Sequence, residues 1–282
     1  MFDGANMKDI GICALCKKEN IELRESHIIP KLAYKRVKAF KNSRFRNFYD
    51  INTIYQDGEK KPLLCSNCEL FFSKYETHFA NNYLDKFLEN KSKLPRLNNK
   101  IDTYIFSVAW RILYDDLFIL NSFDGEHVRK IFEELEKRLH CYLEELRLGN
   151  SPPYPQRIKN YIFLIKDFGF VDEVAEFLGP SLFSYSLHSG DQSKYIVFSH
   201  YTGVVIATVY RPENVFVLGK KLSEYFLDRY TSKIVKKLLK EEIIYQLNTM
   251  IKQQPINEKV LEAGLRDKIR DRYKIDKNKR DK

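Results

Sequence analysis

The sequence predicts an α+β protein in which an N-terminal zinc-bound unit precedes a larger α+β domain with helices and a small antiparallel sheet. Three observations predict this class. Two Cys-x-x-Cys pairs, at 13–16 and 65–68, are spaced as in closed zinc sites. Apolar residues recur at helical spacing over 103–120 and 125–148. Runs rich in β-branched and aromatic residues follow between 160 and 210.

The paired cysteines are expected to bind one structural zinc ion. Cys13 and Cys16 form the first pair and Cys65 and Cys68 the second, with 48 residues between them that a basic helix and a hairpin can fill. Four thiolates complete a tetrahedral site and leave no open position for a substrate, so the metal would be a scaffold. The alternative is a redox or coincidental arrangement of the cysteines.

The segment between the two pairs is basic and aromatic. Residues 31–49 hold seven basic and five aromatic side chains and no acidic one. Asp57-Gly58 then gives a tight-turn signal. After the second cysteine pair, aromatic residues at spacings of three and four predict a helix over 69–88.

The rest of the chain predicts a separate domain. Residues 89–100 are polar and contain a proline, which is typical of a linker. We therefore expect a zinc-binding domain over 1–90, an α+β domain over 101–265 and a basic tail over 266–282. Beyond the two helices named above, the domain is expected to contain a break at Ser151-Pro-Pro-Tyr-Pro, strands at 160–166, 181–187, 195–200 and 203–210, and a helix at 222–252.

Composition narrows the class of protein. Of 282 residues, 44% are hydrophobic, which is enough for a folded core. The net charge of +10 favours a polyanionic partner, nucleic acid first. No apolar run is long enough to span a membrane and no signal peptide is recognised, so a reducing cytoplasm is expected. The fifth cysteine, Cys141, lies in a helical pattern and is expected to be a small core residue.

The N-terminal motifs resemble those of the HNH endonucleases, the zinc-containing members of the ββα-metal (His-Me finger) group with a treble-clef zinc unit. The matching residues are Cys13-x-x-Cys16, the Ser-His-Ile-Ile-Pro segment 26–30, and Leu-Leu-Cys-x-x-Cys at 63–68 followed by a helix. The likeness covers roughly residues 10–85. Paired cysteines alone are common, whereas paired cysteines around His-Ile-Ile-Pro are much more specific.

The resemblance implies a role for each match. His27, at the end of the hairpin, would be the general base that activates water against a phosphodiester. The following helix would supply a ligand to a divalent cation that binds the scissile phosphate. An orienting asparagine is expected between the histidine and the second cysteine pair, and Asn52 is the candidate.

The sequence departs from the family pattern at two positions. Ser26 stands where an acidic residue or a histidine usually precedes the catalytic histidine, and Glu69 stands where asparagine commonly follows the last cysteine. Glu69 and Glu76 are seven apart and about 20° out of register on a helix, whereas His78 points away from Glu69. We therefore expect a His27–Glu69–Glu76 site with Glu76 as the preferred ligand of Mg²⁺ or Mn²⁺. Solvated glutamates on an exposed helix are the alternative.

The basic segment is expected to contact the phosphates of a nucleic acid. Lysine and arginine supply sequence-independent affinity through phosphate contacts, and the aromatic residues can stack on unpaired bases or pack against their own domain. The candidate residues are Lys31, Lys35, Arg36, Lys38, Lys41, Arg44 and Arg46.

The sequence therefore predicts a metal-dependent HNH-type endonuclease that hydrolyses phosphodiester bonds in DNA. A role in defence against foreign DNA, such as phage DNA, is implied by the resemblance alone. Two alternatives stay open. One is a non-catalytic, zinc-dependent nucleic-acid-binding protein, which Ser26 favours. The other is a protein-interaction module, in which residues 101–282 bind a protein partner and zinc stabilises one end.

Overall fold

The N-terminal part is built on an antiparallel pair of strands, β2 (Ile21–His27) and β5 (Lys60–Cys65). The short strand β1 (Ile10–Gly11) extends the sheet on the other side of β2. The register shifts between Arg24 and Glu25, because Arg24 pairs with Leu64 whereas Glu25 pairs with Pro62. Proline has no N–H to give to a ladder, and such a β-bulge is where a sheet tolerates it.

The computed structural model describes residues 9–41, 45–46, 54–55, 58–90, 97–117, 125–170, 178, 182–212 and 231–248. The chain divides into two units. The first comprises residues 1–42 and 58–227, and the second comprises 43–57 and 228–282. This grouping differs from the predicted division at residues 89–100, because helices on the two sides of that linker pack together.

Helices α1 (Lys31–Lys41) and α2 (Ser66–Phe79) follow the two long strands. Beyond α2 the chain continues through a π-helical turn at Ala80–Leu84 into α3 (Asp85–Asn90). The helix expected over 69–88 is thus present, with a π-helical interruption. The aromatic residues at helical spacing supply its buried face.

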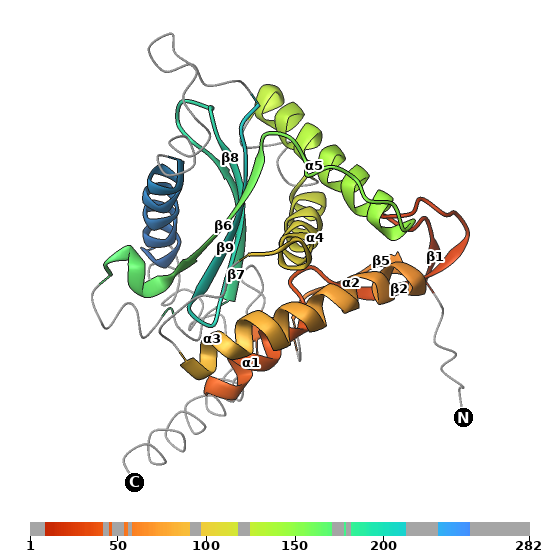
Figure 1. Ribbon diagram of the computed structural model, residues 1–282, viewed down its shortest axis with the longest axis horizontal. Coiled ribbons are helices and arrows are strands. Elements are labelled where there is room, and N and C mark those ends of the chain that lie inside the picture. Colours follow the sequence, from red (N-terminus) through yellow and green to blue (C-terminus); the bar gives the residue numbers. More distant parts are fainter. Residues whose placement is uncertain are drawn as a thin grey trace, which may run out of the picture. The chain divides into compact units, whose positions relative to one another are not determined.

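Helix α4 (Asn99–Asp116) lies at the centre of the first unit, between α2 and the larger sheet (Figure 1). Asn98 caps its start by accepting hydrogen bonds from the amides of Lys100 and Ile101, both at 3.0 Å. The sequence predicted an amphipathic helix, but almost every residue from Ile101 to Leu113 is buried. Contacts with α2, with α5 and with the sheet account for this all-round burial.

Aromatic side chains join α4 to α2. The Phe79 ring stacks on Tyr104 with centroids 4.0 Å apart, and Phe72 meets Trp110 at 5.9 Å. Helix α5 (Gly125–Arg147) is amphipathic, as expected, and buries one stripe of valine, phenylalanine and leucine. These contacts make the N-terminal strands and the following helices one packed body.

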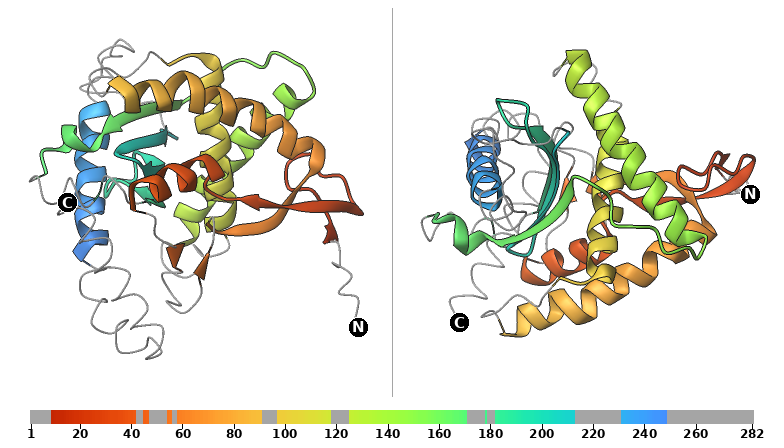
Figure 2. Two further views of the ribbon diagram at one scale, coloured as in Figure 1. Left: turned by 90° about the horizontal axis from the view of Figure 1, so that it is seen from below. Right: turned by 45° about the horizontal axis from the view of Figure 1, so that its top comes forward.

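The larger sheet is antiparallel, with the strand order β6-β9-β8-β7, and α4 covers one of its faces (Figure 2). The strands are β6 (Ile158–Leu164), β7 (Leu182–His188), β8 (Tyr195–Tyr201) and β9 (Val204–Tyr210). All four strands expected from sequence are therefore present. Every residue of β8 and β9 is buried, as their runs of apolar residues require.

The second unit contains a small hairpin of β3 (Phe45–Arg46) and β4 (Ile54–Tyr55) and a helix over 231–248. Val235, Leu239 and Ile243 are buried at spacings of four along that helix. Across the described parts of both units, no helix is both long enough and apolar enough to cross a bilayer. The mixed α+β class and the N-terminal cysteine cluster predicted from sequence are thus confirmed.

Candidate metal centre and active site

The four predicted zinc ligands meet in one cluster. The sulfur atoms of Cys13, Cys16, Cys65 and Cys68 all lie within 4.8 Å of one another, and those of Cys16 and Cys65 are 3.8 Å apart. A tetrahedron with Zn–S bonds of about 2.3 Å has edges of about 3.8 Å. The donor set and its size are therefore compatible with a structural zinc ion.

The main chain supports the cluster from the hairpin. The bulged residue Leu63 has no partner in the β2 ladder, and its carbonyl accepts a hydrogen bond from the amide of Ala14 at 3.0 Å. The amide of Cys65 in turn donates to the sulfur of Cys13 at 3.3 Å. The irregularity at Pro62 thus places the second cysteine pair against the first.

Among the cluster thiols, the protein environment lowers the pKa of Cys13, whereas burial raises the pKa of Cys16 and the pKa of Cys68 is raised as well. The hydrogen bond from the Cys68 thiol is the main cause that lowers the pKa of Cys13 to about 4, with main-chain amides assisting and burial opposing. The same interaction raises the pKa of Cys68. Cys65 and Cys68 also lie at the first turn of α2, where the helix dipole favours negative charge.

His27 is the last residue of β2, opposite Lys60 in the ladder. Its ring lies beside the buried ring of Tyr34, with centroids 6.0 Å apart. Ile28, Ile29 and Pro30 follow and are buried, which fixes the chain between β2 and α1. The predicted base therefore lies at the end of the hairpin.

Glu69 and Glu76 lie on the same face of α2, as helical geometry predicts. The buried hydroxyl of Ser26 faces Glu69. Burial raises the pKa of Glu69, whereas the Ser26 hydroxyl and the charge of Arg111 oppose the rise and Glu76 adds to it. Glu69 is therefore close to Ser26, Glu76 and Arg111.

Arg111 was not predicted from sequence, and it connects the two ends of this cluster. Its Nη1 donates to the main-chain carbonyl of His27 at 3.0 Å, and its Nη2 donates to Glu76 Oε1 at 2.9 Å. The arginine comes from α4, which lies outside the segment that resembles a nuclease. The sequence of α4 has the apolar pattern of a core helix, and nothing in that pattern distinguishes Arg111 as a site residue.

The two carboxylates differ in how they suit a cation. Glu76 Oε1 is already bonded to a guanidinium. Glu69 Oε1 is buried and accepts no hydrogen bond from the described residues. An oxygen without a donor suits a hard cation, whereas a carboxylate oxygen beside a fixed positive charge suits it less. The pair of ligands expected from helical spacing, with Glu76 preferred, stays a prediction, and Glu69 offers the more suitable atom.

His78 was expected to point away from Glu69 on α2. His78 bonds Asn82 within α2 and its π-helical continuation, with 3.2 Å between Nδ1 and the amide nitrogen. Glu25 is exposed. Asn52 lies outside the described residues, so its orienting role stays a prediction.

The predicted nucleic-acid-binding residues are only partly described. Lys31 and Lys35 are exposed on α1, whereas Arg36 forms a bidentate pair with Asp85 at 2.6 and 2.7 Å. Lys38 and Lys41 belong to α1 and Arg46 to β3 by their main chains alone. Arg44 and the tail 266–282 lie outside the described residues.

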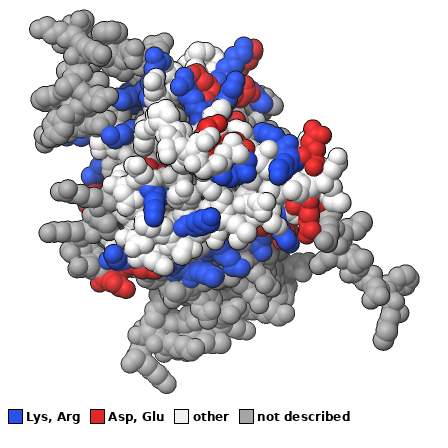
Figure 3. Space-filling view, turned by 45° about the vertical axis from the view of Figure 1, so that its right-hand side comes forward, with Lys and Arg blue, Asp and Glu red and all other residues white. Residues whose placement is uncertain are grey.

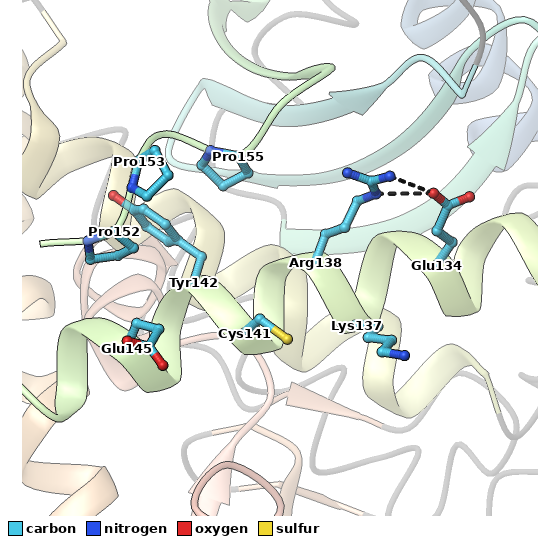
Figure 4. Close-up of a pocket in the computed structure, with 9 residues that line it drawn as sticks. All are labelled: Glu134, Lys137, Arg138, Cys141, Tyr142, Glu145, Pro152, Pro153 and Pro155. Atoms are coloured by element: carbon cyan, nitrogen blue, oxygen red, sulfur yellow. Dashed lines mark hydrogen bonds and ion pairs between the residues drawn. The ribbon is translucent and has the colours of Figure 1, made fainter. Parts of the chain in front are cut away.

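A separate open groove of about 450 Å³ lies between α5 and the proline-rich segment 152–155 (Figure 4). Cys141 lines it and is exposed, so the expectation of a core cysteine was wrong. It lies on the outer face of α5, whose buried stripe is formed by other residues. Within its lining, Arg138 pairs with Glu134 across one helical turn at 2.7 Å.

Comparisons of the chain with protein-family models, with curated proteins and with solved structures returned no match.

Proposed function

We propose that this protein is a metal-dependent endonuclease of the HNH type that hydrolyses phosphodiester bonds in DNA. One observation carries the proposal. Strand β2 ends on His27, the helix after its partner strand β5 carries Glu69 and Glu76, and Arg111 links Glu76 to the His27 main chain beside the cysteine cluster. A base and carboxylates gathered beside a metal scaffold are the parts that phosphodiester hydrolysis requires.

The chain's own residues divide the work as follows. His27 accepts the proton of the attacking water, which an imidazole can do near neutral pH. The cysteine cluster holds the hairpin and the start of α2 in place. Glu69, together with Glu76, would hold Mg²⁺ or Mn²⁺, which when bound offsets the charge that builds on the phosphate.

Helix α1 favours a nucleic acid as the substrate, because its exposed residues Lys31 and Lys35 come directly after the His27 segment and can contact phosphates. On the face shown in Figure 3, basic side chains are separated by uncharged surface and by fewer acidic groups. They do not form one continuous stripe there. The lysines of α1 are therefore the residues whose phosphate contacts should be tested first.

A second function is favoured by two observations at the same site. Ser26 offers no carboxylate beside His27, and Arg111 already neutralises Glu76. A protein that kept the fold without the chemistry would bind nucleic acid and cleave none. This non-catalytic binding protein is the competing proposal.

One experiment on the full chain separates the two. A labelled DNA duplex is titrated at 50 and 200 mM salt in the presence of EDTA, and Mg²⁺ or Mn²⁺ is then added and strand cleavage followed on a denaturing gel. The proposal expects salt-sensitive binding and cleavage only with the cation. Binding without cleavage under either cation favours the non-catalytic protein. No binding at either salt concentration contradicts both.

Lysine variants test the role of α1 in the same assay. Replacing Lys31 and Lys35 together with alanine is expected to reduce the slope of log affinity against log salt by about 2, because each phosphate contact contributes about 0.9. The matched control replaces Lys130 and Lys137 on α5, which removes the same charge elsewhere. Equal effects of the two pairs would argue against a phosphate-binding role of α1.

A further inference from the structure

Arg111 extends from α4 into the cluster formed by β2 and α2. We propose that Arg111 is a positioning residue of the active site, which holds the Glu76 carboxylate and the end of β2 in a fixed relation. The inference depends on the proposed nuclease function and deepens it. It means that a helix outside the nuclease-like segment completes the site.

The geometry uses the planar shape of the guanidinium. The two terminal nitrogens bind different elements, one the His27 carbonyl at 3.0 Å and the other Glu76 Oε1 at 2.9 Å. The Nε atom donates to the carbonyl of Ser107 within α4 at 3.2 Å. Three bonds in one rigid fork fix the distance and the angle between β2 and α2.

The surroundings hold the guanidinium in place. The Arg111 side chain is 2% exposed, and its Cζ atom lies 5.3 Å from the centre of the Phe72 ring. The Glu76 side chain is 22% exposed, so the arginine of this ion pair is buried whereas the glutamate is partly accessible to solvent. A charge this buried is retained only when its partners satisfy it. The charged groups facing it are Glu76 and Glu69.

The position of Arg111 distinguishes orientation from direct chemistry. Its contacts reach the main chain of His27 and one oxygen of Glu76, and its burial keeps it from solvent. It can therefore act on the reaction through the groups it holds. Lysine would keep the charge but presents a single point donor, which cannot bridge both acceptors in the same way.

The test compares Arg111→Lys with the wild type and with Arg129→Lys in the full chain. Arg129 is a matched control, because it also joins a carboxylate, that of Glu133 at 2.7 Å, to a main-chain carbonyl, that of Leu117 at 3.0 Å, away from the site. Zinc content and thermal unfolding are measured first. Then kcat and KM for DNA cleavage are measured separately with Mn²⁺.

Arg111→Lys is expected to keep its zinc and to bind DNA with a KM within about twofold of the wild type. Its kcat is expected to fall about 100-fold, the loss that a misplacement of about 1 Å can cause. Arg129→Lys is expected to match the wild type in all three measurements.

Two results would overturn the role of Arg111 while leaving the nuclease proposal intact. One is a wild-type kcat in Arg111→Lys. The other is loss of zinc and of cooperative unfolding in both Arg111→Lys and Arg111→Gln, since Arg111 would then be required for folding and not for positioning. Absence of cleavage by the zinc-loaded wild type would instead overturn the proposed function, and the role of Arg111 with it.

Discussion

The imidazole of His140 in α5 bonds the main chain of the first cysteine pair, with its Nε2 2.7 Å from the carbonyl oxygen of Leu15. A carbonyl oxygen only accepts, so Nε2 carries the proton in this bond. Leu15 lies between Cys13 and Cys16 and is fully buried. A residue 125 positions along the chain therefore supports the turn that carries Cys13 and Cys16, two of the four cluster cysteines.

Replacing His140 with alanine is expected to loosen this turn without removing a ligand. Zinc content should stay at that of the wild type, while transfer of zinc to a chelator should become about 10-fold faster, since groups outside the ligand shell tune metal affinity. The control is His127→Ala, which removes an exposed histidine from the same helix. Equal transfer rates in the two variants would contradict a supporting role for His140.

The cysteine cluster is expected to hold one zinc ion per chain. Cys68→Ser removes a buried ligand and should abolish zinc retention and lower the unfolding temperature, because metal binding contributes directly to folding free energy. Metal content by elemental analysis and thermal unfolding measure the two effects. Cys141→Ser changes an exposed cysteine outside the cluster and should leave both unchanged. Retention of zinc by Cys68→Ser would contradict the four-cysteine site.

Gly58 lies against the ring of Tyr34, which also neighbours the ring of His27. Its φ is +96°, and a Cβ atom built there would lie 2.0 Å from Tyr34 Cζ. Gly58→Ala is therefore expected to lower the free energy of unfolding by about 2–4 kcal/mol. Gly149→Ala is the control, because Gly149 has a similar φ of +88° and open space around it. Denaturant unfolding should show a smaller loss there, and equal losses would argue against the contact with Tyr34.

Asp116, at the end of α4, gives a pH dependence with a defined sign. Burial raises its pKa from 3.8 to about 6, and the nearby Ser186 hydroxyl only partly opposes the rise. Below about pH 4 the Asp116 carboxyl is protonated in both the folded and the unfolded state, so its burial does not lower the free energy of unfolding. As the pH rises from about 4 to 6, the unfolded state ionises first, and above pH 6 the folded state bears the full cost of up to about 3 kcal/mol.

Asp116→Asn is therefore expected to have a higher free energy of unfolding than the wild type at pH 8 and nearly the same free energy of unfolding below pH 4.

Asp191 provides the opposite case, because the Ser189 hydroxyl and the Ser193 main chain lower its pKa to about 2. Its contribution is present above pH 4 and is lost as the pH falls toward 2, so Asp191→Asn should destabilise at neutral pH. Denaturant titrations at several pH values measure both, and a stabilising effect of Asp116→Asn below pH 4 would contradict this assignment.

Local patterns in the sequence predicted most elements of the fold. The cysteine spacing predicted the cluster, and helical periodicity predicted that Glu69 and Glu76 share a face of α2. The same reasoning could not reveal the environment of α4, because all-round burial depends on elements that approach from three directions. The exposure of Cys141 was missed for a related reason, since a helical pattern shows a residue's face only when the partners of that helix are known.

The candidate site was predictable only where its residues are close in sequence or share a motif. Ser26 and Glu69 were noted as departures from the family pattern, and the structure brings them face to face. Arg111 lies 84 positions after His27 and 35 after Glu76, and no periodicity relates them. Contacts between residues so far apart in the chain depend on how the helices and strands pack, and the sequence of one chain does not reveal that packing.

The most direct test of the proposed nuclease is a time course of supercoiled plasmid nicking by the wild type and by His27→Ala. Both proteins are compared at equal zinc content in Mn²⁺, with EDTA as the blank. The account predicts nicking by the wild type and a loss of at least about 100-fold in His27→Ala, the scale of one general base. Cleavage by His27→Ala at the wild-type rate would contradict it.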